Sequence, residues 1–377
     1  VVDEELKMMS AICAEGGRIT GPHLKQMSRL THTEYVLRGH SNLDPREILR
    51  ETMFAPTVTG SPMQNACAVI RRHETTPRGY YSGVVALFTP SQTVPGTHDV
   101  DAPILIRTVY LRDGGLRVPV GATLVRHSTP EGEVSETHGK AAGVLGAIGA
   151  VARPAMMDAS APRLSDDPEL AALLESRNTR LAPFWLRPQI ALTDADDTAF
   201  TGRTAVIVDA EDRFTTMLAH QLRHLGLHVD VTHWSEADPA ALNAADLGVA
   251  GPGPGGPRDA DNPRIARMRE IVTPRLKQQR PLLAVCLSHQ ILADAIGLEL
   301  APLDAPHQGL QRTVELFGAP ATIGFYNTFT ARVMPGVDAL VTEDGEIIEI
   351  AADADGTGQG IGGLKLASVQ GHLASIL

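Results

Sequence analysis

The sequence predicts a two-domain chain of mixed α/β and α+β class, and three observations support this fold class. The chain has 377 residues, which suits two hydrophobic cores better than one. From Gly202 onward, strand-like runs alternate with helix-like runs, as in a parallel sheet with both faces covered. Residues 153–201 are rich in proline and in acidic residues, which is typical of a linker. We therefore expect domains at residues 1–152 and 202–377, joined by a linker at 153–201.

In the first domain, apolar runs at residues 80–88 and 104–111 favour two strands, the first of them buried. Residues 133–151, rich in alanine and other small residues, favour a helix that ends the domain. Within the linker, only residues 168–176 favour a helix.

The second domain shows the more regular pattern. Its expected helices are 214–225 and 264–279, and its expected strands are 204–209, 228–233, 246–250, 281–285 and 364–369. Because the strands alternate with helices, they are expected to run parallel.

Charge and cysteine content exclude several classes of protein. The chain has 33 lysines and arginines against 44 acidic residues, a net charge of −11, which argues against nucleic-acid and anionic-membrane partners. Three cysteines cannot build a disulfide framework, and none forms a metal-binding pair, so a cytoplasmic setting is expected. No secretory signal opens the sequence, and both ends have the character of cuts within a longer protein.

One cysteine has a position that suits chemistry. Cys286 follows the apolar run 282–285 and precedes a helix-like stretch, so it lies where a strand ends and a helix begins. The helix N-terminus favours a thiolate, and free backbone N–H groups there face any oxyanion that forms. Alternatively, Cys286 is simply a small buried hydrophobic residue.

Two other segments bear on that choice. Residues 251–257 read Gly-Pro-Gly-Pro-Gly-Gly-Pro after a predicted strand, which suits either a close backbone approach to a ligand or a rigid surface loop. His372 follows the last predicted strand. In this order, the three features resemble the class I glutamine amidotransferases, with their Gly-Pro-Gly loop, Cys-Leu-Gly-His-Gln elbow and late Gln-Phe-His-Pro-Glu. The resemblance covers residues 202–377 and implies a flavodoxin-like fold.

The resemblance also implies roles for individual residues. Cys286 would attack the glutamine carboxamide, with His372 as base and then acid, and the backbone N–H groups of Gly253 and Leu287 would hold the oxyanion. The glutamine-binding residues it implies are Gly253, Gly255, Leu287, Gln290, Thr328 and Phe329.

This sequence departs from the family pattern near its end. Ala374 stands where the family has the glutamate that orients the catalytic imidazole, and Ser288 replaces a glycine of the elbow. A thiol needs less help from an oriented base than a hydroxyl does, so activity can persist at a lower level or be largely lost. The family treats His289 as structural.

The first domain holds a second group of polar residues. His32 lies beside a strand-like run, and residues 57–62 form a turn whose hydroxyl and backbone could hold a carboxylate. Glu133, Glu136 and Lys140 have helical spacing and share one face. That face is either a solvated ion-pair surface or a set of hard oxygen ligands for Mg²⁺.

Several short motifs, spaced along the first domain, resemble those in the C-terminal part of the chorismate-utilising enzymes. That family includes the anthranilate, aminodeoxychorismate, isochorismate and salicylate synthases. The motifs include Thr-Gly-Ser-Pro at 59–62, Arg-Gly-Tyr-Tyr-Ser-Gly at 78–83 and Pro-Glu-Gly-Glu-Val-Ser-Glu-Thr at 130–137. The implied fold is the C-terminal part of the chorismate-utilising sandwich. Met63 and Thr123 depart from residues common in the family, and the half of the family fold that carries its general acid is absent.

For the first domain, the resemblance implies an Mg²⁺ site made by Glu5 and Glu136 with Glu133 in support, which binds the ring carboxylate of chorismate. His32 would orient the reacting carbons or carry a proton. The chorismate-binding residues it implies are Thr59, Gly60, Tyr81, Arg107, Gly121 and Lys140.

With both parts on one chain, the sequence resembles fused chorismate-aminating synthases. Residues 286–290 and 325–329 favour the phenazine-pathway type, which aminates chorismate to 2-amino-2-deoxyisochorismate with ammonia from glutamine. The alternatives are an anthranilate synthase, which also eliminates pyruvate, and a non-catalytic remnant. The partners expected are chorismate, glutamine and, because fused members commonly pair, a second copy of the full-length protein.

Overall fold

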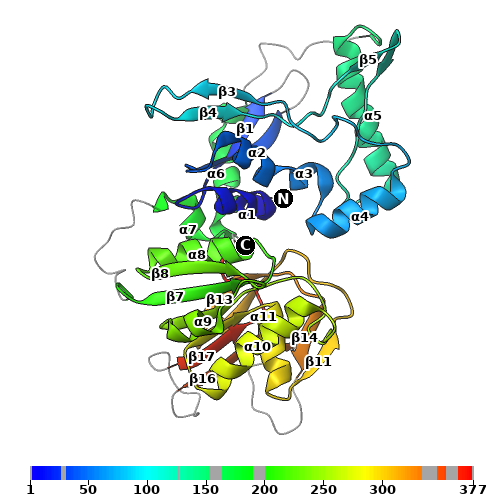
Figure 1. The fold of residues 1–377 in the computed structure, drawn as a ribbon. Coiled ribbons are helices and arrows are strands. Elements are labelled where there is room, and N and C mark those ends of the chain that lie inside the picture. Colours follow the sequence, from blue (N-terminus) through cyan, green and yellow to red (C-terminus); the bar gives the residue numbers. More distant parts are fainter. Residues whose placement is uncertain are drawn as a thin grey trace. The chain divides into compact units, whose positions relative to one another are not determined.

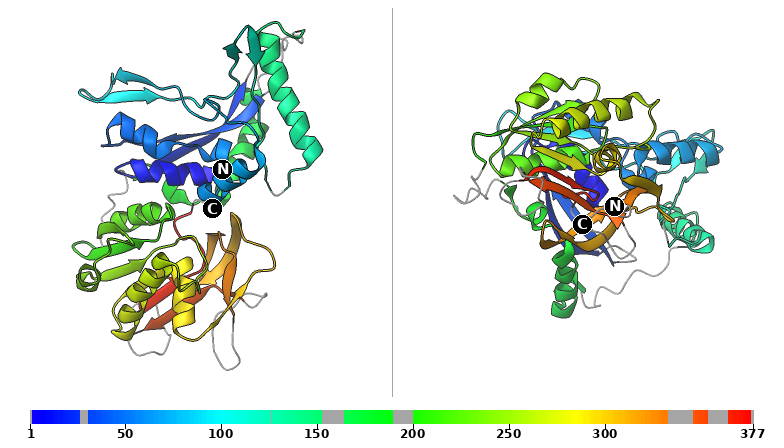
Figure 2. Two further views of the ribbon diagram at one scale, coloured as in Figure 1. Left: turned by 45° about the vertical axis from the view of Figure 1, so that its right-hand side comes forward. Right: turned by 90° about the horizontal axis from the view of Figure 1, so that it is seen from below.

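The structure is a computed structural model that describes residues 2–26, 31–125, 127–152, 164–189, 200–332, 346–353 and 364–375. The chain divides into two compact units (Figures 1 and 2). Unit 1 comprises residues 1–14, 21–36 and 40–176, and unit 2 comprises residues 15–20, 37–39 and 177–377.

Helices and short hairpins make up most of unit 1. Its helices are α1 (Val2–Ile12), α2 (Pro45–Thr52), α3 (Pro56–Thr59), α4 (Met63–His73), α5 (Pro130–Ala147), the 3-10 turn η1 (Leu164–Asp166) and α6 (Pro168–Ser176). Its antiparallel pairs are β3 (Leu87–Pro90) with β4 (His98–Asp101), and β5 (Tyr110–Arg112) with β6 (Gly115–Arg117). A further two-stranded sheet joins β1 (Arg18–Gln26) to β2 (Thr31–Arg38), whose ends extend into the residues of unit 2.

The helix predictions for unit 1 are confirmed, whereas the strand predictions hold only over short stretches. Helix α5 starts three residues before the expected 133–151 and ends before residue 151, and α6 matches 168–176. Residues 79–83 form a turn in which Ser82 has φ 74°. Of the expected buried strand 80–88, Val84 makes an isolated bridge to Ile104, and residues 87–88 lie in β3, a strand of an exposed hairpin. In the expected strand 104–111, Ile104 bridges Val84 and residues 110–111 lie in β5, whereas Arg107, with φ 52°, interrupts the extended backbone between them.

Unit 2 is built on a six-stranded sheet with the order β16-β17-β10-β9-β7-β8. The strands are β7 (Thr204–Asp209), β8 (His228–His233), β9 (Leu247–Ala250), β10 (Leu282–Val285), β16 (Glu349–Asp353) and β17 (Leu364–Val369). All neighbours are parallel except β16, which pairs antiparallel with β17. The five parallel strands have the order 2-1-3-4-5 in chain sequence, that of a flavodoxin-like sheet, as expected.

Three helices pack on this sheet around one apolar core. They are α9 (Pro239–Ala244), α10 (Pro263–Lys277) and α11 (Leu287–Ala295), and a fourth helix, α8 (Phe214–His224), also belongs to the unit (Figures 1 and 2). The core brings Val208, Ala250 and Ala284 of the strands against Met268 and Ile291 of the helices, all of them fully buried. Each strand and helix predicted for residues 202–377 is present within about two residues of its expected bounds.

The second unit also contains strands that the sequence did not predict. The strands β11 (Glu299–Pro302), β14 (Phe329–Arg332) and β15 (Glu346–Ile347) form one antiparallel sheet. The hairpin of β12 (Leu310–Leu316) and β13 (Ala319–Phe325) buries Phe325 against Val369 of β17. These strands place residues 324–329 beside the end of β17.

Part of the predicted linker packs into unit 2. The 3-10 turn η2 (Arg177–Arg180) and helix α7 (Pro183–Leu186) lie in this stretch. The fully buried indole of Trp185 donates a hydrogen bond of 3.0 Å to the carbonyl of Ala374. Linker residues 153–163 and 190–199 are outside the described residues. Across the part of the chain described, no helix has the length and apolar character needed to cross a bilayer.

Candidate active site

The candidate site of unit 2 lies at the edge of the sheet where its parallel strands end. Strands β7, β9, β10 and β17 run in the same direction, so the segments that follow Asp209, Ala250, Val285 and Val369 emerge at one edge. The chain order reverses between β7 and β9, which is where open α/β sheets bind ligands. Cys286, Gly253 and His372 all belong to these segments.

Cys286 forms a sharp turn between β10 and α11. Its backbone has φ 51° and ψ −104°, an unusual conformation for a residue other than glycine, and it caps α11. Its N–H donates to the carbonyl of Val369 (2.9 Å), which fixes the turn against β17. The conformation directs the N-terminus of α11 at the thiol, an arrangement that suits a nucleophile.

The thiol of Cys286 is 6% exposed and protonated at neutral pH. Burial, with a smaller contribution from the charge of Asp212, raises the pKa of Cys286 to about 12, although the backbone N–H of Leu287 acts in the opposite direction. The side-chain amide of Gln370 donates a hydrogen bond of 3.8 Å to the Sγ of Cys286. Attack by this sulfur therefore needs a base that removes its proton.

The glycine-rich loop 251–257 packs closely on the segment that follows β7. A Cβ on Gly253 would clash with the carbonyl oxygen of Ala210, so only glycine fits there without movement of the backbone. The fully buried hydroxyl of Ser288 donates to the carbonyl of Gly251 (2.7 Å) and so joins the elbow to the loop. The replacement of the family's glycine by Ser288 thus adds a hydrogen bond between the two parts of the predicted oxyanion site.

The side chain of Gln290 joins the predicted glutamine-binding residue Phe329 to Gln370. Its buried amide donates to the carbonyl of Phe329 (2.8 Å) and to the side-chain oxygen of Gln370 (3.0 Å). Asn327 donates to the same Phe329 carbonyl (2.9 Å), and the carbonyl of Thr328 accepts from the backbone of Leu303. Gln290, Thr328 and Phe329 are therefore placed close to the segment that leaves β17. Gly255 lies in the loop with φ 112°.

His372 is buried in an aromatic setting. Its ring lies 4.1 Å from that of Phe214 and 5.4 Å from that of Tyr326, measured between centroids, and its backbone N–H donates to Gly324 (2.8 Å). These contacts fix the ring two residues after Gln370, whose amide contacts the sulfur of Cys286. Ala374 is also buried, at 3% exposure, and cannot supply the carboxylate that the family has there.

His289 has the contacts of a structural residue. It is fully buried, and its ring nitrogens contact Ser368 (3.0 Å) and the carbonyl of Ile347 (3.1 Å). Burial lowers the pKa of His289 to about 4, so the ring is neutral at physiological pH. It ties α11 to β17 and β15.

The sequence analysis missed three residues near Cys286 or His372. They are Gln370, Asp212 and Phe214. Gln370 belongs to the family's late Gln-Phe-His pattern, and this could have identified it. The other two precede or begin α8, and nothing in their local sequence indicates that the chain returns to Cys286 and His372.

In unit 1, a chain of contacts joins several of the residues implied to bind chorismate. The ammonium of Lys140 donates to the carbonyl of Gly121 (3.0 Å) and pairs with Glu136 (2.5 Å). A Cβ on Gly121 would lie 2.9 Å from the hydroxyl of Tyr81, so these two residues are adjacent. The structure therefore brings Tyr81, Gly121, Lys140 and Glu136 together.

A second set of contacts surrounds α3. Glu5 accepts hydrogen bonds from the hydroxyl (2.5 Å) and the N–H (3.3 Å) of Thr57, and Thr123 donates to the carbonyl of Thr57 (2.7 Å). Because Thr123 is two residues from Gly121, this set is continuous with the first. Thr59 ends α3, and Gly60 caps it with φ 109°.

The remaining predicted residues of unit 1 are less connected. Arg107 is exposed, and although His32 lies in β2, its side chain is outside the described part of the structure. Glu133 has one buried carboxylate oxygen with no hydrogen-bond partner among the described residues. No three His, Cys, Asp or Glu side chains of the described ranges gather as metal ligands, so Glu5, Glu133 and Glu136 do not form one cluster here.

Two family models match the chain, and each covers most of the residues of one of the two units. Residues 1–146 match the chorismate binding enzymes, and residues 206–377 match the class-I glutamine amidotransferases. The chain therefore carries a chorismate-binding-enzyme segment followed by a class-I glutamine amidotransferase domain.

Curated relatives are similar to this chain over all or nearly all of its length. An "anthranilate synthase, phenazine specific" of Pseudomonas fluorescens is 45% identical over all of this chain, which covers 57% of the relative. The protein of the same description from Pseudomonas chlororaphis is 44% identical, again with 57% covered. An anthranilate synthase of Azospirillum brasilense is 28% identical over 97% of this chain. The chain thus spans little more than half the length of the first two relatives.

Among solved structures, a glutamine amidotransferase of Thermotoga maritima aligns with 46% of this chain and 76% of its own, at 16% identity and a TM-score of 0.38.

Proposed function

We propose that this chain takes part in the glutamine-dependent amination of chorismate to 2-amino-2-deoxyisochorismate, in the pathway to phenazines. Two observations support this function: the buried elbow at Cys286 with its glycine loop, and whole-chain similarity to the phenazine-specific relatives. The alternative product is anthranilate, which forms when the same amination is followed by loss of pyruvate. The relative from Azospirillum brasilense described as an anthranilate synthase supports this alternative more weakly than the phenazine-specific relatives support the first, because it is less similar to this chain.

The first half of the reaction belongs to unit 2. The sulfur of Cys286 attacks the carboxamide carbon of glutamine, and the thiol proton moves to His372. The N–H groups of Gly253 and Leu287 hold the oxyanion until it collapses, and His372 returns the proton to the departing ammonia. Water then hydrolyses the thioester to glutamate. A raised thiol pKa fits this sequence, because the sulfur is kept protonated until a base acts on it.

Because Ala374 replaces the family's glutamate, it cannot supply the carboxylate that would stabilise the imidazolium form of His372. The rings of Phe214 and Tyr326 and the backbone bond to Gly324 fix the position of His372 by packing. Packing orients the ring but does not stabilise the imidazolium that forms during attack. We therefore expect slower turnover than in a domain with the complete triad.

The second half of the reaction belongs to unit 1. Tyr81, Lys140 and the backbone at Gly121 bind chorismate, and Arg107 pairs with a carboxylate of the substrate. Glu5, Glu133 and Glu136 would be the residues to hold Mg²⁺, by their donor chemistry and the unpartnered oxygen of Glu133, but the described side chains do not gather as one cluster, so binding would have to bring them together. When bound, the ion supplies Lewis-acid stabilisation of the charge that develops as the 4-hydroxyl departs. Ammonia from unit 2 is consumed at C2 of the ring.

Ammonia release from glutamine tests the first half with matched cysteine variants. The chain and its Cys67→Ala variant should release ammonia, whereas Cys286→Ala should release it only at background, because Cys67 is an exposed residue of unit 1 and not part of the elbow. Equal background release from all three proteins would refute glutaminase activity.

For the second half, the natural protein that carries this chain is incubated with chorismate, Mg²⁺ and ammonium salt. The mass of the product then distinguishes aminodeoxyisochorismate from anthranilate, and absence of an aminated product refutes the proposal.

Magnesium binding to the chain gives a separate test of the metal site. Glu133→Gln should weaken Mg²⁺ affinity, measured by calorimetry, by at least about tenfold, because a carboxylate ligand loses its charge. Glu131→Gln, on an exposed part of the same helix, should leave the affinity unchanged. Equal affinity in the two variants would contradict the proposed ligand set.

A further inference from the structure

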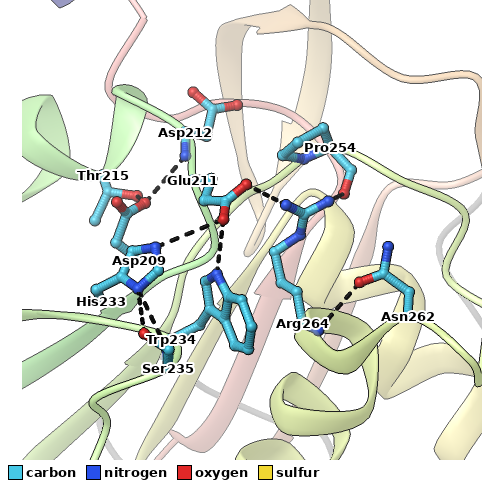
Figure 3. A network of polar contacts seen from close by, with 10 residues as sticks. All are labelled: Asp209, Glu211, Asp212, Thr215, His233, Trp234, Ser235, Pro254, Asn262 and Arg264. Carbon is cyan, nitrogen blue, oxygen red and sulfur yellow. Dashed lines mark hydrogen bonds and ion pairs between the residues drawn. The ribbon is translucent and has the colours of Figure 1, made fainter. Parts of the chain in front are cut away.

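The loop that carries Gly253 is held by an ion pair that the catalytic roles above do not use (Figure 3). Arg264, in the first turn of α10, donates to the carbonyl of Pro254 (2.8 Å), the residue that follows Gly253. The same guanidinium pairs with the carboxylate of Glu211. One side chain therefore joins the loop 251–257 to the segment that follows β7.

Several neighbouring side chains hold Glu211 in place. Its backbone has φ 71°, a conformation that costs free energy for a residue with a side chain and persists only when surrounding contacts enforce it. Besides Arg264, its carboxylate accepts from the indole N–H of Trp234 (2.9 Å) and lies 3.6 Å from His233 (Figure 3). The Trp234 hydrogen bond, and the charges of Arg264 and His233, hold the pKa of Glu211 below its ordinary value against partial burial, so it remains ionised.

The contact between the two segments is close at the predicted oxyanion site. Gly253 packs on the backbone of Ala210, the residue before Glu211. Pro254 follows Gly253 in the sequence and Glu211 follows Ala210, so Arg264 bonds to the next residue after each of the two. Its side chain is 13% exposed, and its charge is matched by the carboxylate. A planar guanidinium can hold both groups at once, which a lysine ammonium does less well.

We propose that Arg264, fixed by Glu211, is a positioning residue that sets the orientation of the Gly253 N–H toward the oxyanion formed on glutamine. This inference rests on the glutaminase function proposed above. Arg264 acts through the carbonyl of Pro254 and does not touch the substrate. Its loss leaves the thiol and the predicted glutamine-binding residues Gln290, Thr328 and Phe329 in place, while the Gly253 N–H that holds the oxyanion moves.

The kinetic test compares Arg264→Ala with Arg267→Ala in the full chain. Arg267 lies on the same helix and also donates to a carboxylate, that of Glu270 (2.8 Å), and to a carbonyl, that of Ala237. Arg264→Ala should lower kcat for glutamine hydrolysis about 10- to 100-fold with little change in KM, because displacement of an oriented group by about 1 Å has effects of this size. Arg264→Lys should restore part of the loss, and Arg267→Ala should retain the wild-type kcat.

Two further measurements separate this inference from the function on which it rests. Alkylation of Cys286 by iodoacetamide uses no oxyanion donor, so Arg264→Ala should leave its rate unchanged. Backbone amide exchange in residues 251–257 should become faster in Arg264→Ala and stay unchanged in Arg267→Ala. Wild-type kcat in Arg264→Ala, or an equal loss in both alanine variants, would overturn the inference. If the wild-type chain releases no ammonia, the proposed function fails, and amide exchange alone decides whether Arg264 holds the loop: equal exchange in the two variants refutes it.

Discussion

At the scale of single residues, Cys286 combines features that favour and oppose reactivity. The strained turn directs backbone N–H groups toward the sulfur, whereas burial and the charge of Asp212 raise its pKa to about 12. A protonated, buried thiol is protected from oxidation and from alkylation when no substrate is present. Its reactivity then depends on a base and on a bound carbonyl, which gives His372 and Gly253 their roles.

The raised pKa predicts how Cys286 reacts with an alkylating agent. Between about pH 7 and 10, its thiolate fraction stays small and grows about tenfold per pH unit, so the alkylation rate should grow likewise without a plateau. Peptide mass spectrometry after timed iodoacetamide treatment measures this, with exposed Cys67 as the internal reference. A plateau in the Cys286 rate below pH 9 would show that the thiol ionises readily.

At the scale of elements, α11 depends on the neutral state of His289. The folded protein holds this ring uncharged, with a pKa lowered from 6.5 to about 4, between Ser368 of β17 and Ile347 of β15. The unfolded chain binds the proton more tightly, so the contribution of His289 to stability is complete above pH 6.5. It decreases as the pH falls from 6.5 to 4.

This linkage predicts a loss of unfolding free energy that approaches about 3 kcal/mol near pH 4. Denaturant unfolding of unit 2, followed by Trp fluorescence and circular dichroism between pH 7 and 4, measures it. His289→Gln should unfold more easily at pH 7 but show a shallower decrease. Parallel curves for the two proteins would mean that another group governs acid destabilisation.

The sequence predicted the elements of unit 2 far better than those of unit 1. Strands such as β7 and β9 are continuous apolar runs buried on both faces, a local signal that needs no knowledge of the partner strand. In unit 1, the apolar run 80–88 pairs with residues 103–105 only around Val84, and its first residues form a turn in which Tyr80 is 76% exposed. Pairing is non-local, and local pattern did not reveal it.

The candidate site divides in the same way. Cys286 and Gly253 were predictable because their segments, taken in order, resemble the elbow and the glycine loop of a known family, whereas local sequence alone left a buried cysteine and a rigid surface loop as alternatives. Glu211 and Arg264 were not, because 53 residues separate the two partners and only the fold brings them together. Positioning residues of this kind carry little local signal.

At the scale of the whole molecule, the two proposed chemistries belong to two different units of one chain. Unit 2 contains the buried thiol and its loop, and unit 1 contains the linked residues Tyr81, Gly121, Lys140 and Glu136. A unit that makes ammonia and a unit that consumes it benefit from a common chain, because the intermediate is lost by diffusion otherwise. That the full-length protein pairs as a homodimer stays a prediction.

Interception of the thioester tests the central claim most directly. Hydroxylamine added with glutamine should convert the acyl group on Cys286 to γ-glutamyl hydroxamate, which is quantified by mass. The account predicts hydroxamate from the chain and from Cys67→Ala, and none above background from Cys286→Ala. Equal hydroxamate with and without Cys286, or none from the unaltered chain, would contradict it.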